Sequence, residues 1–149
     1  MLNETLKTLF NRDLNRLKSE IDAYQSEENI WQISHGITNS AGNLCLHLLG
    51  NLNTYIGAIL GGTDYVRNRE LEFSLKDIPK QELINMIEAT IGVVSKTLDQ
   101  VSNEQMDNEY PILVFEEKTS TEFFLVHLTT HLTYHLGQIN YHRRLLDRR

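Results

Sequence analysis

The chain has 149 residues, of which 40% are hydrophobic and 23% charged, as expected for a single globular domain spanning residues 1–149. Its 8 glycines and 2 prolines are few for an all-β fold, and a formal net charge of −6 argues against nucleic acid or an anionic membrane as a general partner. No apolar run is long enough to cross a membrane, and the N-terminus is too polar for a signal peptide, so we expect a cytoplasmic protein. Cys45 is the one cysteine, which excludes an intrachain disulfide and suits a reducing compartment.

The first half of the chain predicts two helices. Residues 3–28 carry apolar side chains at helical spacing with charges between them, which indicates an amphipathic helix. A loop over residues 31–36 precedes three candidate N-caps, Thr38, Asn39 and Ser40. The second helix is expected to run to about Leu60 and to end at the glycines 61–62. It is apolar on most sides, so it belongs in the middle of a bundle or against a partner subunit.

The second half predicts two more helices. A polar connection over residues 63–78 leads to Pro79, expected in the first turn of a third helix whose buried stripe ends near Val101. A second connection, residues 103–118, contains a stretch at 110–115 that we expect to be extended. Thr119 and Glu122 predict a capping box for a fourth helix over about 120–147. The basic residues at 142–149 suit a helix C-terminus. The pattern predicts an all-α fold, a four-helix bundle with two long connections.

Histidines mark the candidate functional site. His127, His131 and His135 follow one another at intervals of four, which places them on one helix face, and His47 lies alone among leucines on the second helix. A His-x-x-x-His pair can chelate a transition metal, and a third imidazole would complete a three-nitrogen site with open positions. The residues alone do not choose between the pairs 127/131 and 131/135. They also allow a bundle in which the histidines only pack and no metal binds.

Two segments resemble the DinB-like family, bacterial four-helix proteins named for DNA-damage-inducible members. HLTTHLTYHLGQI at 127–139 looks like that family's last-helix signature, and NLCLHLLGNL at 43–52 resembles its second-helix ligand segment. The resemblance implies His47, His131 and His135 as ligands of a divalent transition metal, zinc or nickel, with His127 as a neighbour one turn away. Characterised relatives include thiol-dependent transferases and isomerases that activate a low-molecular-weight thiol such as mycothiol, bacillithiol or glutathione.

The sequence therefore supports two hypotheses from different classes. The first is a metal-dependent enzyme, transferase-like or hydrolase-like, with a three-histidine centre that activates a small thiol or water against an electrophilic substrate. The second is a non-catalytic metal-binding stress-response module or dimeric scaffold. We expect a homodimer in either case, because the apolar second helix suits a subunit interface as well as a core.

Several other residues have two interpretations each. Gln138 could orient a metal ligand or make an interhelix hydrogen bond. Arg67 and Arg69 could hold an anionic substrate near the mouth of the bundle, or form ion pairs with neighbouring glutamates in a solvated loop.

Five further side chains have simpler expected roles. Tyr55 and Tyr134 are expected in the core, with a phenol beside the metal as the alternative. Cys45 is expected to be a small buried hydrophobe, and His35 and His142 are expected at the surface or as capping groups.

Overall fold

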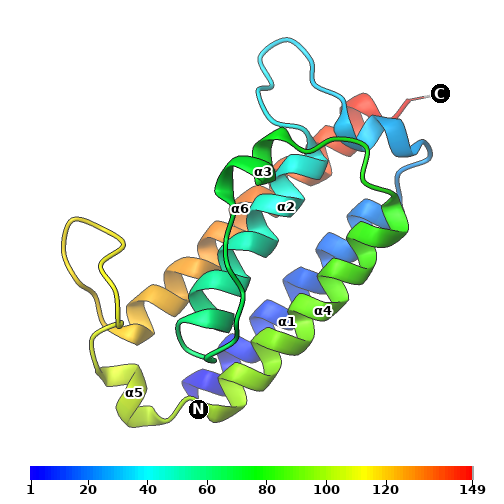
Figure 1. Cartoon of the computed structure of the whole chain (residues 1–149). Coiled ribbons are helices and arrows are strands. Elements are labelled where there is room, and N and C mark those ends of the chain that lie inside the picture. Colours follow the sequence, from blue (N-terminus) through cyan, green and yellow to red (C-terminus); the bar gives the residue numbers. More distant parts are fainter. Residues whose placement is uncertain (149) are drawn as a thin grey trace.

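Four long helices form the bundle in the computed structural model, which describes residues 1–148 (Figure 1). They are α1 (Leu2–Asp22), α2 (Ala41–Leu52), α4 (Lys80–Gln100) and α6 (Thr121–Leu146). Shorter elements are the 3₁₀ segment η1 (Glu27–Trp31), the π-helical segment η2 (Asn53–Ala58), α3 (Arg69–Ser74) and α5 (Asn103–Asp107). Residues 1–148 contain no strand, so the predicted all-α class is confirmed.

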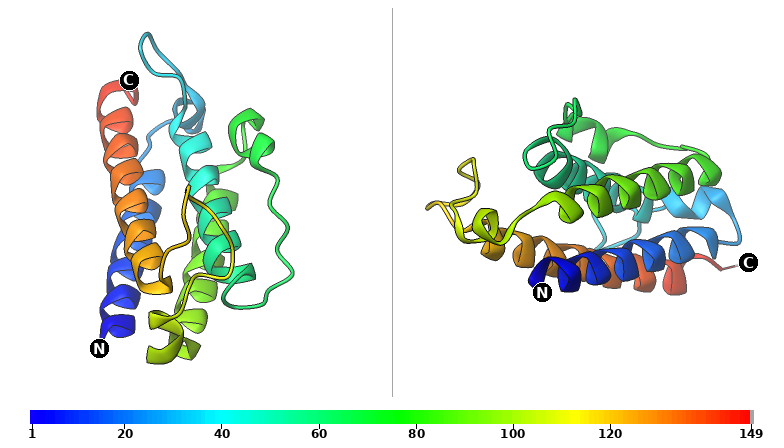
Figure 2. Two further views of the ribbon diagram at one scale, coloured as in Figure 1. Left: turned by 90° about the vertical axis from the view of Figure 1, so that its left-hand side faces the viewer. Right: turned by 90° about the horizontal axis from the view of Figure 1, so that it is seen from below.

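The helices are arranged so that α2 lies beside α6. In the ribbon views α1 and α6 run in one direction and α2 and α4 in the other (Figures 1 and 2). Each of α1 and α2 packs against both α4 and α6. Because α2 and α4 are parallel, the chain must return along the whole bundle between them, and this connection carries α3 across α2. That crossing brings the predicted polar connection 63–78 over the middle of the bundle.

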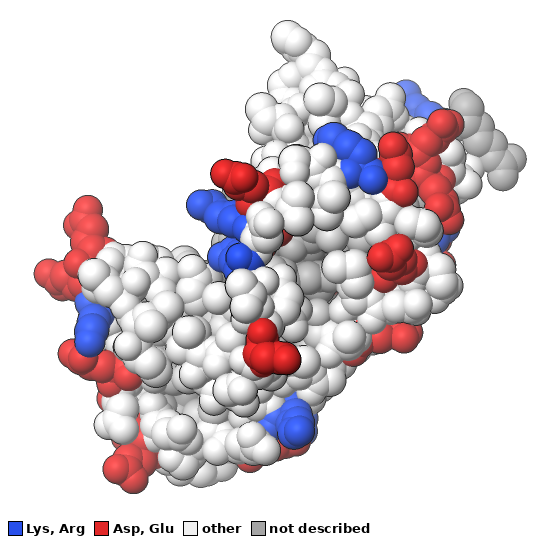
Figure 3. All heavy atoms as spheres, in the orientation of Figure 1, with Lys and Arg blue, Asp and Glu red and all other residues white. Residues whose placement is uncertain are grey.

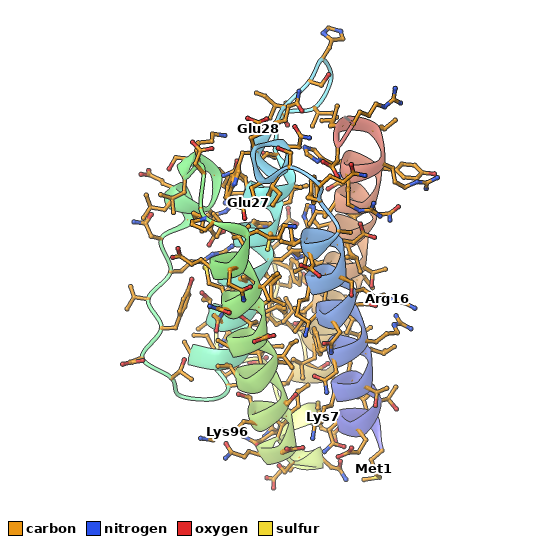
Figure 4. All side chains as sticks on the ribbon, turned by 90° about the vertical axis from the view of Figure 1, so that its right-hand side faces the viewer. Met1, Lys7, Arg16, Glu27, Glu28 and Lys96 are labelled. Carbon is orange, nitrogen blue, oxygen red and sulfur yellow. The ribbon has the colours of Figure 1, made fainter. Side chains whose placement is uncertain are left out.

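The core is built around α2. Every residue from Ala41 to Leu52 is buried, so this helix lies in the interior, and the alternative of an α2 face for a partner subunit is wrong. The other long helices each bury one stripe and expose charges, as Arg16 of α1 and Lys96 of α4 show (Figure 4). Burying a large apolar side chain contributes about 1.5–3 kcal/mol, so these stripes supply most of the stabilisation.

Helix ends differ from the prediction in the first half of the chain. The first helix stops at Asp22, and residues 27–31 form η1, which buries Trp31 that was expected in a loop. Among the three candidate N-caps of α2, Ser40 is the one used, because its hydroxyl accepts a hydrogen bond from the Asn43 amide. The predicted helix end at the glycines holds, since Gly62 adopts a φ of 66°.

The approach to α6 corrects two predictions. Ser120, not Thr119, is the N-cap, and its hydroxyl accepts from the Phe123 amide, so the predicted Thr119–Glu122 capping box is one residue out of register. The stretch 110–115 is not a strand: the nearest pairing is a single bridge between Glu109 and Ser120. Tertiary packing decides this, because the buried ring of Tyr110 contacts Phe124 at a centroid distance of 4.2 Å and its hydroxyl donates to the Tyr55 carbonyl at 2.6 Å.

Candidate metal centre

Three imidazoles meet between α2 and α6. His47 comes from α2, and His131 and His135 lie one turn apart on α6, which packs beside it. His47 Nε2 and His131 Nε2 are 3.2 Å apart, and the ring centroids of His131 and His135 are 4.6 Å apart. One nitrogen from each of the three rings lies within 4.8 Å of the other two. The structure thus brings together the three residues that the DinB-like resemblance implied as ligands.

The spacing of these nitrogens suits one small divalent ion. Imidazole nitrogens lie about 2.0–2.1 Å from zinc, so two ligands of a tetrahedral site are roughly 3.3 Å apart. The 3.2 Å between His47 and His131 matches that value. Within the whole group no pair of these nitrogens is more than 4.8 Å apart. Three neutral nitrogens leave open coordination positions, as catalytic zinc sites do.

A buried nitrogen without a partner distinguishes His131 from His142. Within residues 1–148, its Nδ1 is buried and makes no hydrogen bond. His142 is the contrasting case: its Nδ1 accepts from the Tyr24 hydroxyl at 2.6 Å, and its Nε2 donates to the Gln32 carbonyl at 2.7 Å. Buried histidines that only pack are satisfied in this second way. His131 is therefore less fully hydrogen-bonded than His142; an ion held at its Nε2, the nitrogen that faces His47, would leave Nδ1 unchanged.

Burial keeps two of the three rings in the form that binds metals. Desolvation lowers the pKa of His47 below its usual value, against the opposing effect of Glu72. Desolvation also lowers the pKa of His131, to about 4, with a further contribution from the neighbouring histidines. A neutral imidazole offers a lone pair to a metal ion. Both rings are consequently ready to ligate near neutral pH.

A carboxylate that sequence reasoning missed stands behind His47. Glu72 of α3 is buried, and its Oε1 lies 3.1 Å from His47 Nδ1. Because a carboxylate only accepts, His47 Nδ1 donates and leaves the Nε2 lone pair free to face His131. Arg67 neutralises Glu72 through two hydrogen bonds of 2.8 and 3.0 Å. In the sequence nothing separates Glu72 from the exposed Glu70, since both lie in the same polar connection.

Gly50 makes the approach of Glu72 feasible. A Cβ on Gly50 would overlap the Glu72 carboxylate, so only glycine on α2 leaves room for it. The sequence alone assigns no role to this glycine. Its role depends on α3 crossing at that position, which only the tertiary structure decides.

Gln138 supports His135 in the way that Glu72 supports His47. Its Oε1 lies 2.7 Å from His135 Nδ1, three residues earlier on the same helix. The His135 Nδ1 therefore donates to the amide oxygen, which fixes the ring orientation. This agrees with the interpretation of Gln138 as an orienting group; within residues 1–148 the hydrogen bond that Gln138 makes lies inside α6 and not between helices.

His127 stays outside the three-ring group. Its ring centroid is 6.5 Å from that of His131, and it packs edge-on against Phe115 at 4.8 Å. The pair 131/135 is accordingly the one that converges with His47. His127 instead lines a cavity of about 270 Å³ that opens onto His47 and His131.

This cavity has a polar mouth. Arg67, Arg69 and Asn51 line it together with His127. Arg69 lies over the Phe73 ring at 5.9 Å, whereas Arg67 is bound to Glu72. The predicted ion pair with a glutamate thus holds for Arg67, but in a half-buried setting rather than a solvated loop. Asn51 is buried, and its Oδ1 makes no hydrogen bond within residues 1–148.

Comparison with known proteins places this architecture in a family. Residues 3–149 match the model of DUF1572, described as a protein of unknown function. The chain belongs to this family. A crystal structure of the conserved protein of locus from Enterococcus faecalis is similar, with a TM-score of 0.76 over 96% of this chain and 95% of that one. At 18% identity this similarity shows the fold alone. No curated protein matches the chain.

The remaining candidate residues of this DUF1572 chain differ in their burial. Tyr134 is exposed and therefore not in the core, but its ring lies 5.2 Å from the His135 ring, centroid to centroid. Tyr55 is half-buried against Phe124. Cys45 is buried as expected, and desolvation raises the pKa of its thiol to about 12. His35 is exposed, but the expectation of a surface position for His142 is wrong, because α6 turns it inward.

Two other expectations concern membrane-spanning segments and the basic tail. Among the helices described in residues 1–148, none has the length and apolar character required to span a membrane. The basic tail is described as far as residue 148: Arg143 bonds Glu20 at 2.7 Å, and residue 149 lies outside the described residues.

Proposed function

We propose that this DUF1572 protein is a DinB-like, divalent-metal-dependent enzyme whose ligands are His47, His131 and His135. The observation that supports the proposal most is the convergence of three imidazole nitrogens within 4.8 Å. Two of these rings are additionally oriented from behind, by Glu72 and Gln138. Such orienting groups are typical of functional metal sites, and random packing of histidines has no reason to produce them.

The proposed chemistry is activation of a small thiol or water for attack on an electrophilic substrate. A divalent ion, zinc or nickel, would supply Lewis acidity at its open positions and lower the pKa of the group bound there. Thiol-dependent S-transfer is the specific reaction that we propose, by analogy with the DinB-like resemblance.

The chain's own residues would define the reaction chamber. The cavity beside His47 and His131 is large enough for a small substrate, and Phe124 and Leu128 contribute an apolar wall. Arg69 at the mouth would attract an anionic group, because within residues 1–148 it has no ion-pair partner and only stacks on Phe73. His127, on the same wall, has nitrogens that could exchange a proton with a bound molecule.

Metal analysis of protein purified without a polyhistidine tag is the first test. We expect about one zinc or nickel ion per chain, and loss of that ion in His131→Ala, since two imidazoles rarely hold such an ion. His35→Ala is the matched control, because this histidine is exposed and remote from the cluster. Retention of the full metal content by His131→Ala would refute the proposed site.

Turnover distinguishes the enzyme from a metal-binding module. Wild-type protein would be assayed against a chlorinated nitroarene and an epoxide, each with bacillithiol, mycothiol and glutathione. We expect thiol-dependent consumption of the electrophile that disappears in His131→Ala. A stoichiometric ion without any thiol-dependent turnover would favour the non-catalytic stress-response module.

A further inference from the structure

An exposed apolar stripe runs along the whole of α6. Phe123, Tyr134 and Tyr141 expose 57%, 66% and 63% of their surface, although all three are large and aromatic. We call this set the α6 stripe; its apolar members, spaced by three, four or seven to eight residues, are Phe123, Val126, Tyr134, Tyr141 and Leu145. The spacing puts them on one helix face, opposite the buried stripe that packs into the core. Several large apolar side chains exposed on one helix face are typical of an interaction site.

Gly137 lies within the α6 stripe, and no contact within the single chain requires a glycine there. A Cβ at this position would have no neighbour within 4 Å. Glycine in a helix interior weakens the helix relative to alanine, so an open position would ordinarily hold a larger residue. Close approach of a second backbone would account for it. The helix face thus combines exposed aromatic side chains with a gap between Tyr134 and Tyr141.

The two ends of the α6 stripe carry opposite charges. Glu122 lies at its start, in the first turn of α6, and acidic side chains gather at that end of the molecule (Figure 3). Arg144 lies at its other end, over the Tyr141 ring at 5.2 Å. Within residues 1–148, neither Glu122 nor Arg144 has an ion-pair partner. An antiparallel second copy would place the acidic end of one helix against the basic end of the other.

The order of residues along the α6 stripe is self-complementary. In an antiparallel pair centred near Tyr134, Phe123 faces Leu145 of the other copy and Val126 faces Tyr141. The same register brings Glu122 close to Arg144. We propose that the α6 stripe is the interface of a homodimer in which two α6 helices pack antiparallel about a two-fold axis near Tyr134. An interface of this type is isologous, and it therefore closes at two subunits.

The α6 stripe alone is smaller than a standard interface, so the proposed dimer also requires the loops at both ends of α6. The α6 stripe is roughly 33 Å long and about 10 Å wide, the width of one helix. Its area is therefore less than the roughly 800 Å² that a standard interface buries on each partner. Loops 32–40 and 111–118 project beyond the bundle at the two ends of α6 (Figure 1). They expose the apolar side chains Ile33, Ile112, Leu113, Val114 and Phe115. Antiparallel packing brings the second loop of one copy to the first loop of the other.

This dimer would also cover a groove that adjoins the candidate metal centre. A groove of about 440 Å³ lies between residues 36–39 and α6, and it contains His135 and Gln138 as well as Tyr134 and Tyr141 of the α6 stripe. A second copy seated on the stripe would close this groove. The dimer itself does not depend on the proposed function, because no residue of the stripe is a proposed ligand.

Sedimentation velocity of the full chain tests the interface. At about 50 µM, well above a micromolar Kd, we expect wild-type protein at the mass of two chains and both Tyr134→Arg and Gly137→Leu at the mass of one. Val66→Arg is the control, because Val66 is an exposed apolar residue remote from α6 and should leave the dimer intact. Circular dichroism of every variant reports whether the helices still form. We expect Gly137→Leu to fold like the wild type, because Gly137 has free space around it.

Charge reversal tests the antiparallel register. Glu122→Arg and Arg144→Glu should each raise the dimer Kd several-fold, and the double variant should restore it, because the reversed charges again face each other. A wild-type protein that sediments as one chain would overturn the homodimer. A dimer that persists in both Tyr134→Arg and Gly137→Leu would overturn its location, and lack of rescue in the double variant would overturn its register.

Discussion

Replacing Glu72 by glutamine tests the layer that lies behind His47. Glu72 accepts one hydrogen bond from His47 at 3.1 Å and two from Arg67 at 2.8 and 3.0 Å. Glutamine keeps the size but offers one acceptor oxygen and no charge, so these three bonds cannot all persist. Arg67 would then keep its charge in a half-buried position without a carboxylate partner.

The size of the effect follows from the role of the bond to His47. Removing a group that orients a metal-ligating histidine lowers metal affinity about 10- to 100-fold, equivalent to about 1.4–2.8 kcal/mol. We expect a zinc Kd for Glu72→Gln that is higher than wild type by this factor. Protein freed of metal with a chelator would be titrated with zinc in competition with a chromophoric chelator. Loss of the carboxylate also destabilises the metal-free protein, because the buried positive charge of Arg67 is left unpaired.

Glu70→Gln provides the matched control for this experiment. Glu70 belongs to the same short helix and undergoes the same charge change, but it is exposed, and no contact with His47 is present. We expect its zinc Kd to stay within twofold of wild type. Equal zinc affinity in Glu72→Gln and Glu70→Gln would show that the carboxylate does not orient His47, and the reasoning about the centre would be refuted at this point.

Three further predictions concern stability. Gly50→Ala should lower the free energy of unfolding in urea by about 1–2 kcal/mol, because the added Cβ overlaps Glu72. Gly92→Ala has open space around it and should raise the free energy of unfolding by about 0.5–1 kcal/mol. Equal effects of the two substitutions would contradict the close approach of Glu72 to Gly50. Burial lowers the pKa of His142, so the unfolded chain binds more protons below about pH 6.5 and stability falls on acidification. His142→Gln should reduce this pH dependence of the melting temperature, measured with a chelator present, and an unchanged slope would count against it. Adding a chelator to the metal-loaded protein should lower its melting temperature, and no shift would argue against an ion bound to the native state.

Helical periodicity allowed the architecture to be predicted to a large extent. The spacing of apolar residues identified the four long helices, and the polar composition of residues 63–78 identified the long return connection. Helix ends were less certain, because caps depend on single side chains. Ser40 was one of three equivalent candidates, and Ser120 and Thr119 differ by only one position. The short elements α3 and α5 form under tertiary contacts and left no periodic signal.

The candidate centre was predictable only in part, because only some of its features are local in the sequence. A spacing of four on one helix is a local property, so His131 and His135 could be recognised as a pair. Their meeting with His47, 84 residues away from His131, depends on the packing of α2 against α6. The residues alone did not choose between His127 and His135, and the DinB-like resemblance made that choice.

Local sequence determined the helices, their apolar faces and the histidine spacing, because these properties repeat over a few residues along the chain. The tertiary structure alone decided which exposed face of α6 remains without a neighbour and which of two adjacent glutamates, Glu70 or Glu72, becomes buried. Burial of Glu72 requires α3 to cross α2 at Gly50, a contact between segments more than twenty residues apart. Such a contact is set by the packing of the whole bundle, and no short stretch of sequence encodes it.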